Sequence, residues 1–145
     1  MNRYEEGIKL IEESCGNGKD NVIALSTVVM EPNADGMPSS CVRDVDAYYE
    51  DGVFYITTWA KSNKMLQIAQ NKETAFAVCF EGIYGHGIGE NLGWVLDPKN
   101  AELRVKLRLC RLVRSGKRRK RRELCYSGDP HYSCQNHERP RRGAL

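Results

Sequence analysis

The sequence lacks the features that mark membrane, secreted and multidomain proteins. Its 145 residues suffice for one hydrophobic core but are too few for two ordinary domains. It contains no apolar run of about 18 residues, the length that a membrane-spanning helix needs. The N-terminal segment carries Glu5 and Glu6 and no apolar stretch, so no secretory signal is predicted. We therefore expect a cytoplasmic protein with no membrane partner.

The chain contains six cysteines but lacks a predicted secretory signal. The cysteines divide equally between the first 106 residues and the rest, and they are Cys15, Cys41, Cys79, Cys110, Cys125 and Cys134. Without a secretory signal they are expected to be reduced thiols and not a disulfide framework.

Basic residues are scarce in most of the chain and abundant at its end. Residues 1–106 hold 10 Lys and Arg against 16 Asp and Glu, a net charge of −6. Residues 107–145 hold 12 Lys and Arg against 3 Asp and Glu, a net charge of +9. Such an abrupt change in charge indicates that the two parts of the chain differ in character. We expect a folded domain over residues 1–107 and a basic tail over residues 108–145.

The first part has the pattern of a small α+β domain. Apolar residues at helical spacing, β-branched runs and turn residues alternate along it. The expected elements are helices over residues 4–15, 63–71 and from 98 onward, strands over residues 21–30, 39–49, 53–58 and 74–80, and a mobile glycine-rich loop over residues 82–93. Asp35-Gly36 and Asp51-Gly52 supply turn chemistry between the first three strands. Three strands joined in this way form an antiparallel meander, which closes most economically as a small barrel.

Three polar residues form the most informative cluster. Arg43 lies among apolar residues of the second strand, and Ser62 and Lys64 stand at the opening of a helix. A helix N-terminus offers unpaired N–H groups and a positive dipole end, so these side chains together suit a phosphate. The alternative is purely structural, with Ser62 as an N-cap, Lys64 solvated, and Arg43 paired with an adjacent aspartate.

The order of the motifs distinguishes these alternatives. The ordered segments are Arg43-Asp44-Val45, Gly52 to Thr58, Ser62-Asn63-Lys64, Asn71, His86 to Gly93 and Leu96 to Leu103. This series resembles the pyridoxamine 5′-phosphate oxidase-like family of FMN-binding split barrels, over residues 1 to about 107. The resemblance implies an α+β fold, a small antiparallel split β-barrel with flanking helices.

The resemblance also implies roles for individual residues. Arg43, Ser62 and Lys64 would hold the FMN phosphate. Thr57 and Thr58 would approach the phosphate or the ring edge, and Val45 would lie beside the isoalloxazine. The family further implies a homodimer with flavin at its interface. No residue is assigned as an acid or base catalyst.

Other candidates carry less weight. The glycines around His86 have the wrong spacing for a dinucleotide-binding loop, and a single histidine in a loop is usually just exposed. Trp59 and Trp94 are expected in the core or at the dimer interface.

The basic tail has three interpretations. The run from Lys117 to Arg122 would bind nucleic-acid phosphates by charge alone. Four residues could ligate zinc, namely Cys125, His131, Cys134 and His137, but their spacing does not match a zinc finger, and no metal site is predicted. The third interpretation is a shift of the reading frame near Leu107–Leu109.

Codon arithmetic favours the frameshift over a genuine basic arm. One permitted choice of codons for Lys117 to Leu124 is AAA-CGA-AGA-AAA-CGA-CGA-GAA-CTT, and this string read one base later gives NEENDEN. The same shift further along, with permitted codons, gives the alternating segment ILAIRIT, which is typical of a strand. The tail as it stands has too few aliphatic residues to order itself, so we expect the final barrel strand to be missing and residues from about 110 onward to be disordered.

These observations lead to one main functional hypothesis. The chain is expected to bind FMN and to act as a flavin-dependent oxidoreductase of unknown substrate, in which the flavin carries the redox chemistry. The alternative is a non-enzymatic protein that binds nucleic acid through its basic arm, which we consider the weaker hypothesis.

Overall fold

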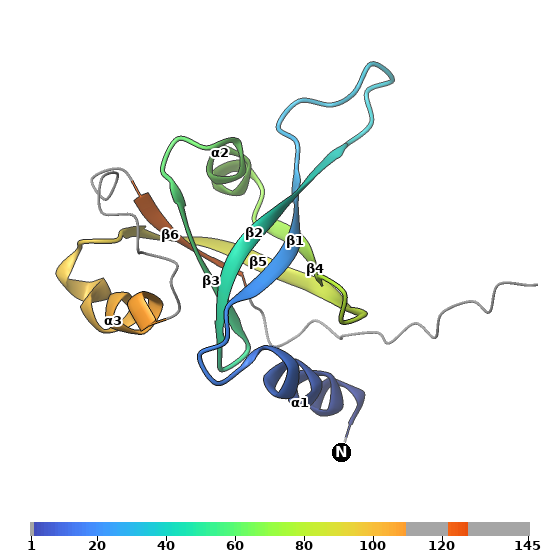
Figure 1. Cartoon of the computed structure of the whole chain (residues 1–145). Coiled ribbons are helices and arrows are strands. Elements are labelled where there is room, and N and C mark those ends of the chain that lie inside the picture. The colour runs from blue at the N-terminus through green and yellow to red at the C-terminus, as the bar shows by residue number, and fades with distance from the viewer. Residues whose placement is uncertain (1, 110–121, 128–145) are drawn as a thin grey trace, which may run out of the picture.

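Six antiparallel strands form a closed barrel. The computed structural model describes residues 2–109 and 122–127, with side chains described for residues 2–107. Neighbouring strands follow the order β1-β2-β3-β6-β5-β4 (Figure 1). The strands are β1 (Asn21–Val28), β2 (Ser40–Glu50), β3 (Val53–Trp59), β4 (Glu73–Val78), β5 (Ile83–Trp94) and β6 (Arg122–Ser127). The helices are α1 (Arg3–Cys15), α2 (Asn63–Gln70) and α3 (Ala101–Leu109), the last preceded by the 3-10 turn η1 (Pro98–Asn100). The predicted α+β barrel with flanking helices is confirmed.

Local turn and cap chemistry sets the boundaries of these elements as predicted. Asp51 and Gly52, with φ of 50° and 82°, form the two-residue turn between β2 and β3, where Glu50 pairs with Val53. The Asp97 side chain accepts the backbone N–H of Lys99 at 3.0 Å and so caps η1. The first three strands therefore form the predicted antiparallel meander, and short-range sequence fixes its β2–β3 turn.

The segment predicted as a glycine-rich loop is the long strand β5, so that prediction is wrong. Gly85, Gly87 and Gly89 are buried at alternate positions, while His86 between them is exposed. A Cβ on Gly89 would lie 3.0 Å from two side-chain carbons of Ile68 in α2. The glycines therefore leave room at the inner face of the barrel. Because glycine has no side chain, the alternation of buried and exposed residues along this strand produces no alternation of apolar and polar residues in the sequence.

The sixth strand comes from within the basic tail. Backbone of β6 pairs with β3 on one side and with β5 on the other, whereas the sequence analysis expected no final strand. A strand in this position satisfies the edge N–H and C=O groups of both neighbours. Residues 110–121 and 128–145, where disorder was expected, lie outside the described residues, as do three of the four zinc-ligand candidates.

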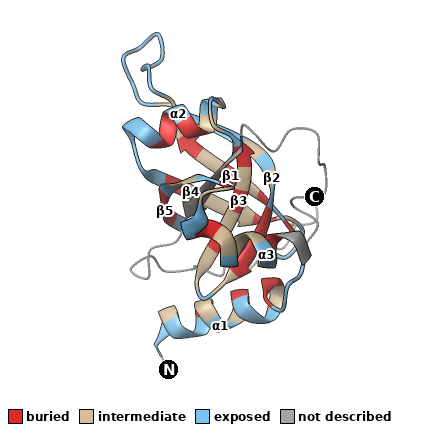
Figure 2. Cartoon of the chain, turned by 90° about the vertical axis from the view of Figure 1, so that its left-hand side faces the viewer, coloured by how far each residue is buried: buried red, intermediate tan, exposed pale blue. Residues whose placement is uncertain are grey.

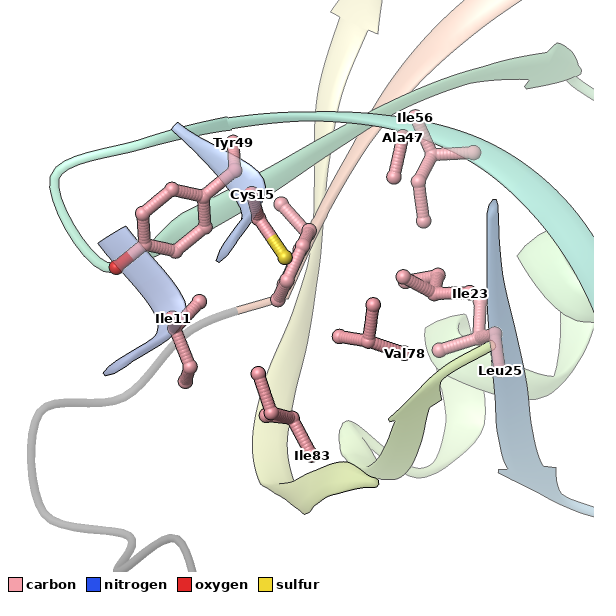
Figure 3. Close-up of a cluster of buried hydrophobic side chains, with 10 residues drawn as sticks. Ile11, Cys15, Ile23, Leu25, Ala47, Tyr49, Ile56, Val78 and Ile83 are labelled. Atoms are coloured by element: carbon pink, nitrogen blue, oxygen red, sulfur yellow. The ribbon is translucent and has the colours of Figure 1, made fainter. Parts of the chain in front are cut away.

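The main hydrophobic core fills the barrel and continues under α1. Inward residues of β1 and β2, including Ile23, Leu25 and Ala47, belong to one buried cluster that extends to Ile11 and Cys15 of α1 (Figure 3). Helices α1 and α2 lie at opposite ends of the barrel and turn their buried faces toward it (Figures 1 and 2). The interior is thus closed at one end by apolar residues.

Two tryptophans are not part of this core. Trp59, at the end of β3, and Trp94, at the end of β5, are 50% and 45% exposed. Neither is therefore in the core: Trp59 follows the outward, odd-numbered positions of β3, and Trp94 ends β5 in a stretch of exposed and half-buried residues. Their alternative place, at a dimer interface, stays a prediction. No helix within the described part of the chain is long and apolar enough to cross a membrane.

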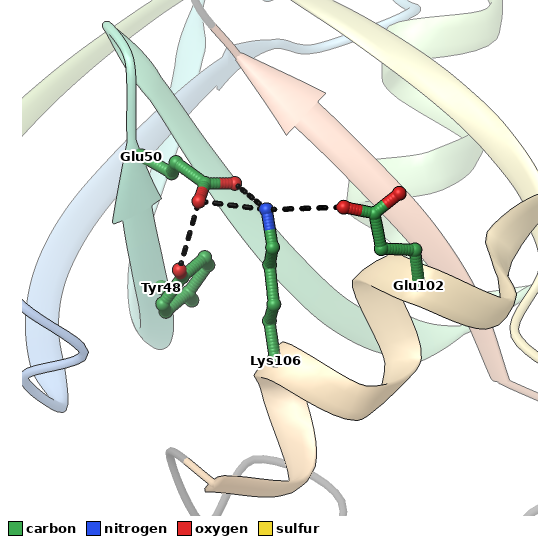
Figure 4. Close-up of polar contacts among 4 residues, drawn as sticks. All are labelled: Tyr48, Glu50, Glu102 and Lys106. Carbon is green, nitrogen blue, oxygen red and sulfur yellow. Dashed lines mark hydrogen bonds and ion pairs between the residues drawn. The ribbon is translucent and has the colours of Figure 1, made fainter.

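Helix α3 is held against the outside of the barrel. Its buried Leu107 packs with Tyr48 of β2 and with Val95. The Lys106 ammonium lies 2.8 Å from both carboxylate oxygens of Glu50 and 3.7 Å from Glu102 (Figure 4). The hydrogen bond to Glu50 raises the pKa of Lys106. A second small core and an ion pair thus fix α3 beside β2.

The buried thiol of Cys15 gives a prediction about alkaline stability. Burial, with a smaller contribution from Glu81 and an opposing one from Lys19, raises its pKa from 9.0 to about 11. As the pH rises, the thiol therefore loses its proton in the unfolded chain at a lower pH than in the folded protein. The free energy of unfolding falls as the pH rises from 9.0 to about 11, by up to about 1.4 kcal/mol for each pH unit. Urea unfolding at pH 8, 9, 10 and 11 is expected to show this fall.

The control is Cys15→Val, which keeps an apolar side chain and removes the titrating group. Its fall in stability over the same pH range should be smaller than that of the unchanged protein. Equal slopes for the two proteins would contradict the assignment. Thiol alkylation of the folded protein should also modify exposed Cys41 much faster than Cys15, which has no exposed surface.

Candidate functional site

Arg43 points into the end of the barrel that α2 covers. It lies on the same face of β2 as Val45 and Ala47, both of which contact the barrel core. Its guanidinium donates from Nη1 to the Thr27 hydroxyl of β1 and from Nη2 to the Gln67 amide oxygen of α2, the latter at 3.0 Å. The guanidinium therefore links two strands to the covering helix.

A second polar group forms where β3 leads into α2. The Lys64 ammonium donates to the Thr58 hydroxyl at 2.9 Å, and that hydroxyl lies 3.4 Å from the hydroxyl of Ser62. Ser62 occupies the N-cap position of α2, yet its side chain makes no capping hydrogen bond. The hydroxyl of Ser62 thus faces Thr58 and not the helix N–H groups, which leaves it suited to a bound anion at this helix end.

Helix α2 joins these two groups into one site. Lys64 and Gln67 lie three residues apart, hence on neighbouring positions of one helix face. We use the name polar strip for the six residues Thr27, Arg43, Thr58, Ser62, Lys64 and Gln67. The particular contacts of the purely structural alternative are not the ones found: Ser62 makes no capping hydrogen bond, Lys64 donates to Thr58, and Arg43 donates to Thr27 and Gln67.

The charge of Arg43 is not balanced by a carboxylate in the described part of the chain. None of the ion pairs found there involves Arg43. Asp44 and Asp46 alternate with Arg43 along β2 and are exposed on the opposite face. The acceptors of the guanidinium are uncharged oxygens. A half-buried cation with neutral partners favours the binding of an anion.

The fold itself has solved relatives. No protein-family model and no curated protein sequence matches the chain. A candidate pyridoxamine 5′-phosphate oxidase from Listeria innocua matches with a TM-score of 0.61 at 12% identity, covering 94% of this chain and 100% of the other. The fold is that of the pyridoxamine 5′-phosphate oxidase-like split barrels. The resemblance drawn from the sequence is thereby confirmed at the level of the fold.

Other split barrels of known structure differ in their ligands. An FAD-binding protein from Mesorhizobium loti matches with a TM-score of 0.52 at 15% identity, covering 90% of each chain. A heme-binding protein from Mycobacterium smegmatis matches with a TM-score of 0.58 at 12% identity, covering 94% of this chain and 58% of the other. The fold alone therefore does not specify the ligand, which depends on the side chains of the site.

The structure brings together four of the six site residues named from the sequence. Arg43, Thr58, Ser62 and Lys64 belong to the polar strip of the split barrel. Val45 instead packs its side chain against the barrel core. Thr57 precedes Thr58 in β3 and so lies on the other face of that strand. The roles assigned to Val45 and Thr57 stay predictions.

Sequence reasoning missed Thr27 and Gln67. Both are buried polar residues, and the Thr27 hydroxyl donates to the Gln67 amide oxygen. A signal for each was present, because Thr27 continues the inward positions of Ile23 and Leu25, and Gln67 interrupts the buried face of Met65 and Ile68. A polar residue at a core position usually has a partner, and here each is the partner of the other.

Proposed function

We propose that this split barrel binds FMN and holds its phosphate at the polar strip. Arg43, Thr58, Ser62 and Lys64 would contact the phosphate. The observation that carries the proposal is a half-buried guanidinium with uncharged partners, joined through α2 to an ammonium and two hydroxyls at a helix start. Two cationic side chains, hydroxyl donors and helix N–H groups are the usual means of binding a phosphate monoester.

The donor set fits a phosphate in its chemistry. The guanidinium can present two parallel N–H donors, and the ammonium acts as a point charge beside them. Arg43 is held in place by Thr27 and Gln67, which reduces the entropy lost when an anion binds. When bound, the flavin would supply electron or hydride transfer. The chain's part is to bind and orient it, and Thr57 and Val45 are proposed to lie near the ring.

The proposal includes an oxidoreductase activity of unknown substrate and a homodimer with flavin at its interface. The FAD-binding split barrel from Mesorhizobium loti supports a flavin, while the heme-binding one from Mycobacterium smegmatis favours a different cofactor.

The first experiment is an absorption spectrum of the purified chain after incubation with FMN, and separately with heme, followed by desalting. Flavin bands retained after desalting would support the proposal, and heme retention without flavin retention would contradict it.

Lys64→Ala is expected to weaken FMN binding about tenfold, because it removes one charge-assisted contact worth about 1.5 kcal/mol. Quenching of flavin fluorescence gives the dissociation constants of FMN and of riboflavin, which lacks the phosphate. Only the FMN value should rise. The matched control is Lys61→Ala, an exposed lysine three residues earlier. An equal loss for both flavins, or an equal effect of the control, would count against a phosphate contact at Lys64.

A further inference from the structure

A groove lies beside the polar strip, between the long β1–β2 loop and the second half of α2. It has a volume of about 240 Å³ and is lined by Val28, Val29, Met30, Pro32, Gly36, Pro38, Gln67, Gln70 and Asn71. The loop projects from the end of the barrel next to α2 (Figure 1). This volume is at the small end for ligand pockets and suits a molecule of one or two rings.

The loop wall of the groove is held in shape by its own hydrogen bonds. The Asn33 side chain accepts the backbone N–H groups of Asp35 and Met37, each at 3.0 Å. The Asn33 backbone donates to Met37 and accepts from Gly36, both at 2.9 Å. The Asn33 side-chain bonds form an Asx-type turn, so this wall is largely formed before any ligand arrives.

The lining is uncharged and has two chemically distinct sides. Valine, methionine and proline side chains of the loop form an apolar side, and three side-chain amides of α2 and its C-terminal cap form the other. No lysine, arginine, aspartate or glutamate is among the lining residues. Such a site favours a neutral molecule over a phosphate or another ion.

One of those amides has an unused donor. Gln67 is only 6% exposed, and its amide oxygen accepts from Arg43 and from the Thr27 hydroxyl. These two donors fix the orientation of the amide, because its nitrogen could not accept from them. The amide nitrogen has no acceptor among the residues that the structure describes. A buried donor without a partner costs about 1–3 kcal/mol, so an acceptor from outside the described chain is expected there.

From these observations we propose that the groove is a binding site for a small uncharged molecule with an apolar ring body and one hydrogen-bond acceptor. The acceptor binds the amide nitrogen of Gln67, and the ring body packs on the valine, methionine and proline side chains. Gln67 belongs to both the polar strip and the groove, but the two sites use different atoms: Arg43 donates to its amide oxygen, and the ligand of the groove accepts from its amide nitrogen and needs no charge.

The test uses quinoline, which has one ring nitrogen as acceptor, and naphthalene, which has the same shape and none. Each is titrated without flavin into ¹⁵N-labelled protein, and the side-chain amide signal of Gln67 is followed by NMR. We expect quinoline to shift this signal saturably and to bind at least fivefold more tightly than naphthalene. The signal is assigned from its absence in Gln67→Met.

Two exposed methionines of the same loop provide the matched variants. Met30 lines the groove and Met37 does not, and they are 44% and 61% exposed. Met30→Glu places a charge at the apolar wall and should weaken quinoline binding at least fivefold, whereas Met37→Glu should leave it unchanged. Absence of any shift up to the solubility limit would mean that water alone serves the Gln67 donor, and it would overturn the proposal. Equal binding of naphthalene, or an unchanged affinity in Met30→Glu, would overturn it as well.

Discussion

Replacing Arg43 with alanine is expected to weaken FMN binding by about 10- to 100-fold, since a charge-assisted contact contributes about 1.5–3 kcal/mol. The loss exceeds that at Lys64 because the guanidinium can bind two phosphate oxygens and is held in place by Thr27 and Gln67. Riboflavin should bind the variant and the unchanged protein almost equally. The ratio of the riboflavin and FMN dissociation constants, measured by fluorescence quenching, is therefore the decisive quantity.

Arg43 also has a structural role, which the same comparison separates from binding. Its removal takes away the donor to the Thr27 hydroxyl and one of the two donors to the Gln67 amide oxygen, and it is expected to lower the free energy of unfolding by about 1–3 kcal/mol. A general loss of structure would weaken FMN and riboflavin together. Arg104→Ala is the control, because Arg104 lies on α3 and donates to the Val95 carbonyl at 3.4 Å. An unchanged ratio in Arg43→Ala would place the phosphate elsewhere.

Restoring the shifted reading frame from Arg108 onward is expected to raise the free energy of unfolding by on the order of 5 kcal/mol. The present strand β6 contains one aliphatic residue, Leu124. In the shifted segment ILAIRIT, every second position is leucine or isoleucine. Three such side chains on one face of a strand would enter the barrel, each contributing about 1.5–3 kcal/mol when fully buried. Thermal and urea unfolding of the two chains measure the difference.

The control is a frame-restored chain in which the second, fourth and sixth residues of ILAIRIT (one leucine and two of its three isoleucines) are replaced by threonine. It keeps the strand length and β propensity but not the aliphatic face, and it should lose most of the gain. Sequencing the source DNA across codons 105–112 tests the origin of the tail directly. A frame-restored chain no more stable than the present one would contradict the hypothesis that the basic tail replaces a natural final strand. FMN affinity is expected to rise with stability, because β3, which carries Thr58, pairs with β6.

The sequence by itself determined the elements whose boundaries depend on local chemistry. Asp51-Gly52 accepts the positive φ angles of a tight turn, and Asp97 before Pro98 caps a helical start. The run rich in β-branched residues over 21–30 predicted a buried strand, which the structure places at Asn21–Val28. Arg43 is also recognisable from its neighbours in the sequence, because a charged residue among apolar residues of a strand requires a partner or a ligand. Each of these signals lies within a few residues of the feature that it specifies.

Only the tertiary structure decided which distant residues meet. The glycines of β5 predict a loop from sequence because an inward position without a side chain leaves no hydrophobic pattern, and only the approach of Ile68 explains Gly89. Thr27 and Gln67 are 40 residues apart, and their hydrogen bond exists because α2 covers the barrel end. Closing the barrel places the inward ends of β1, β2 and β3 beneath one helix, and this convergence creates the polar strip. Contacts of this kind depend on how the strands pair, which short-range sequence does not encode.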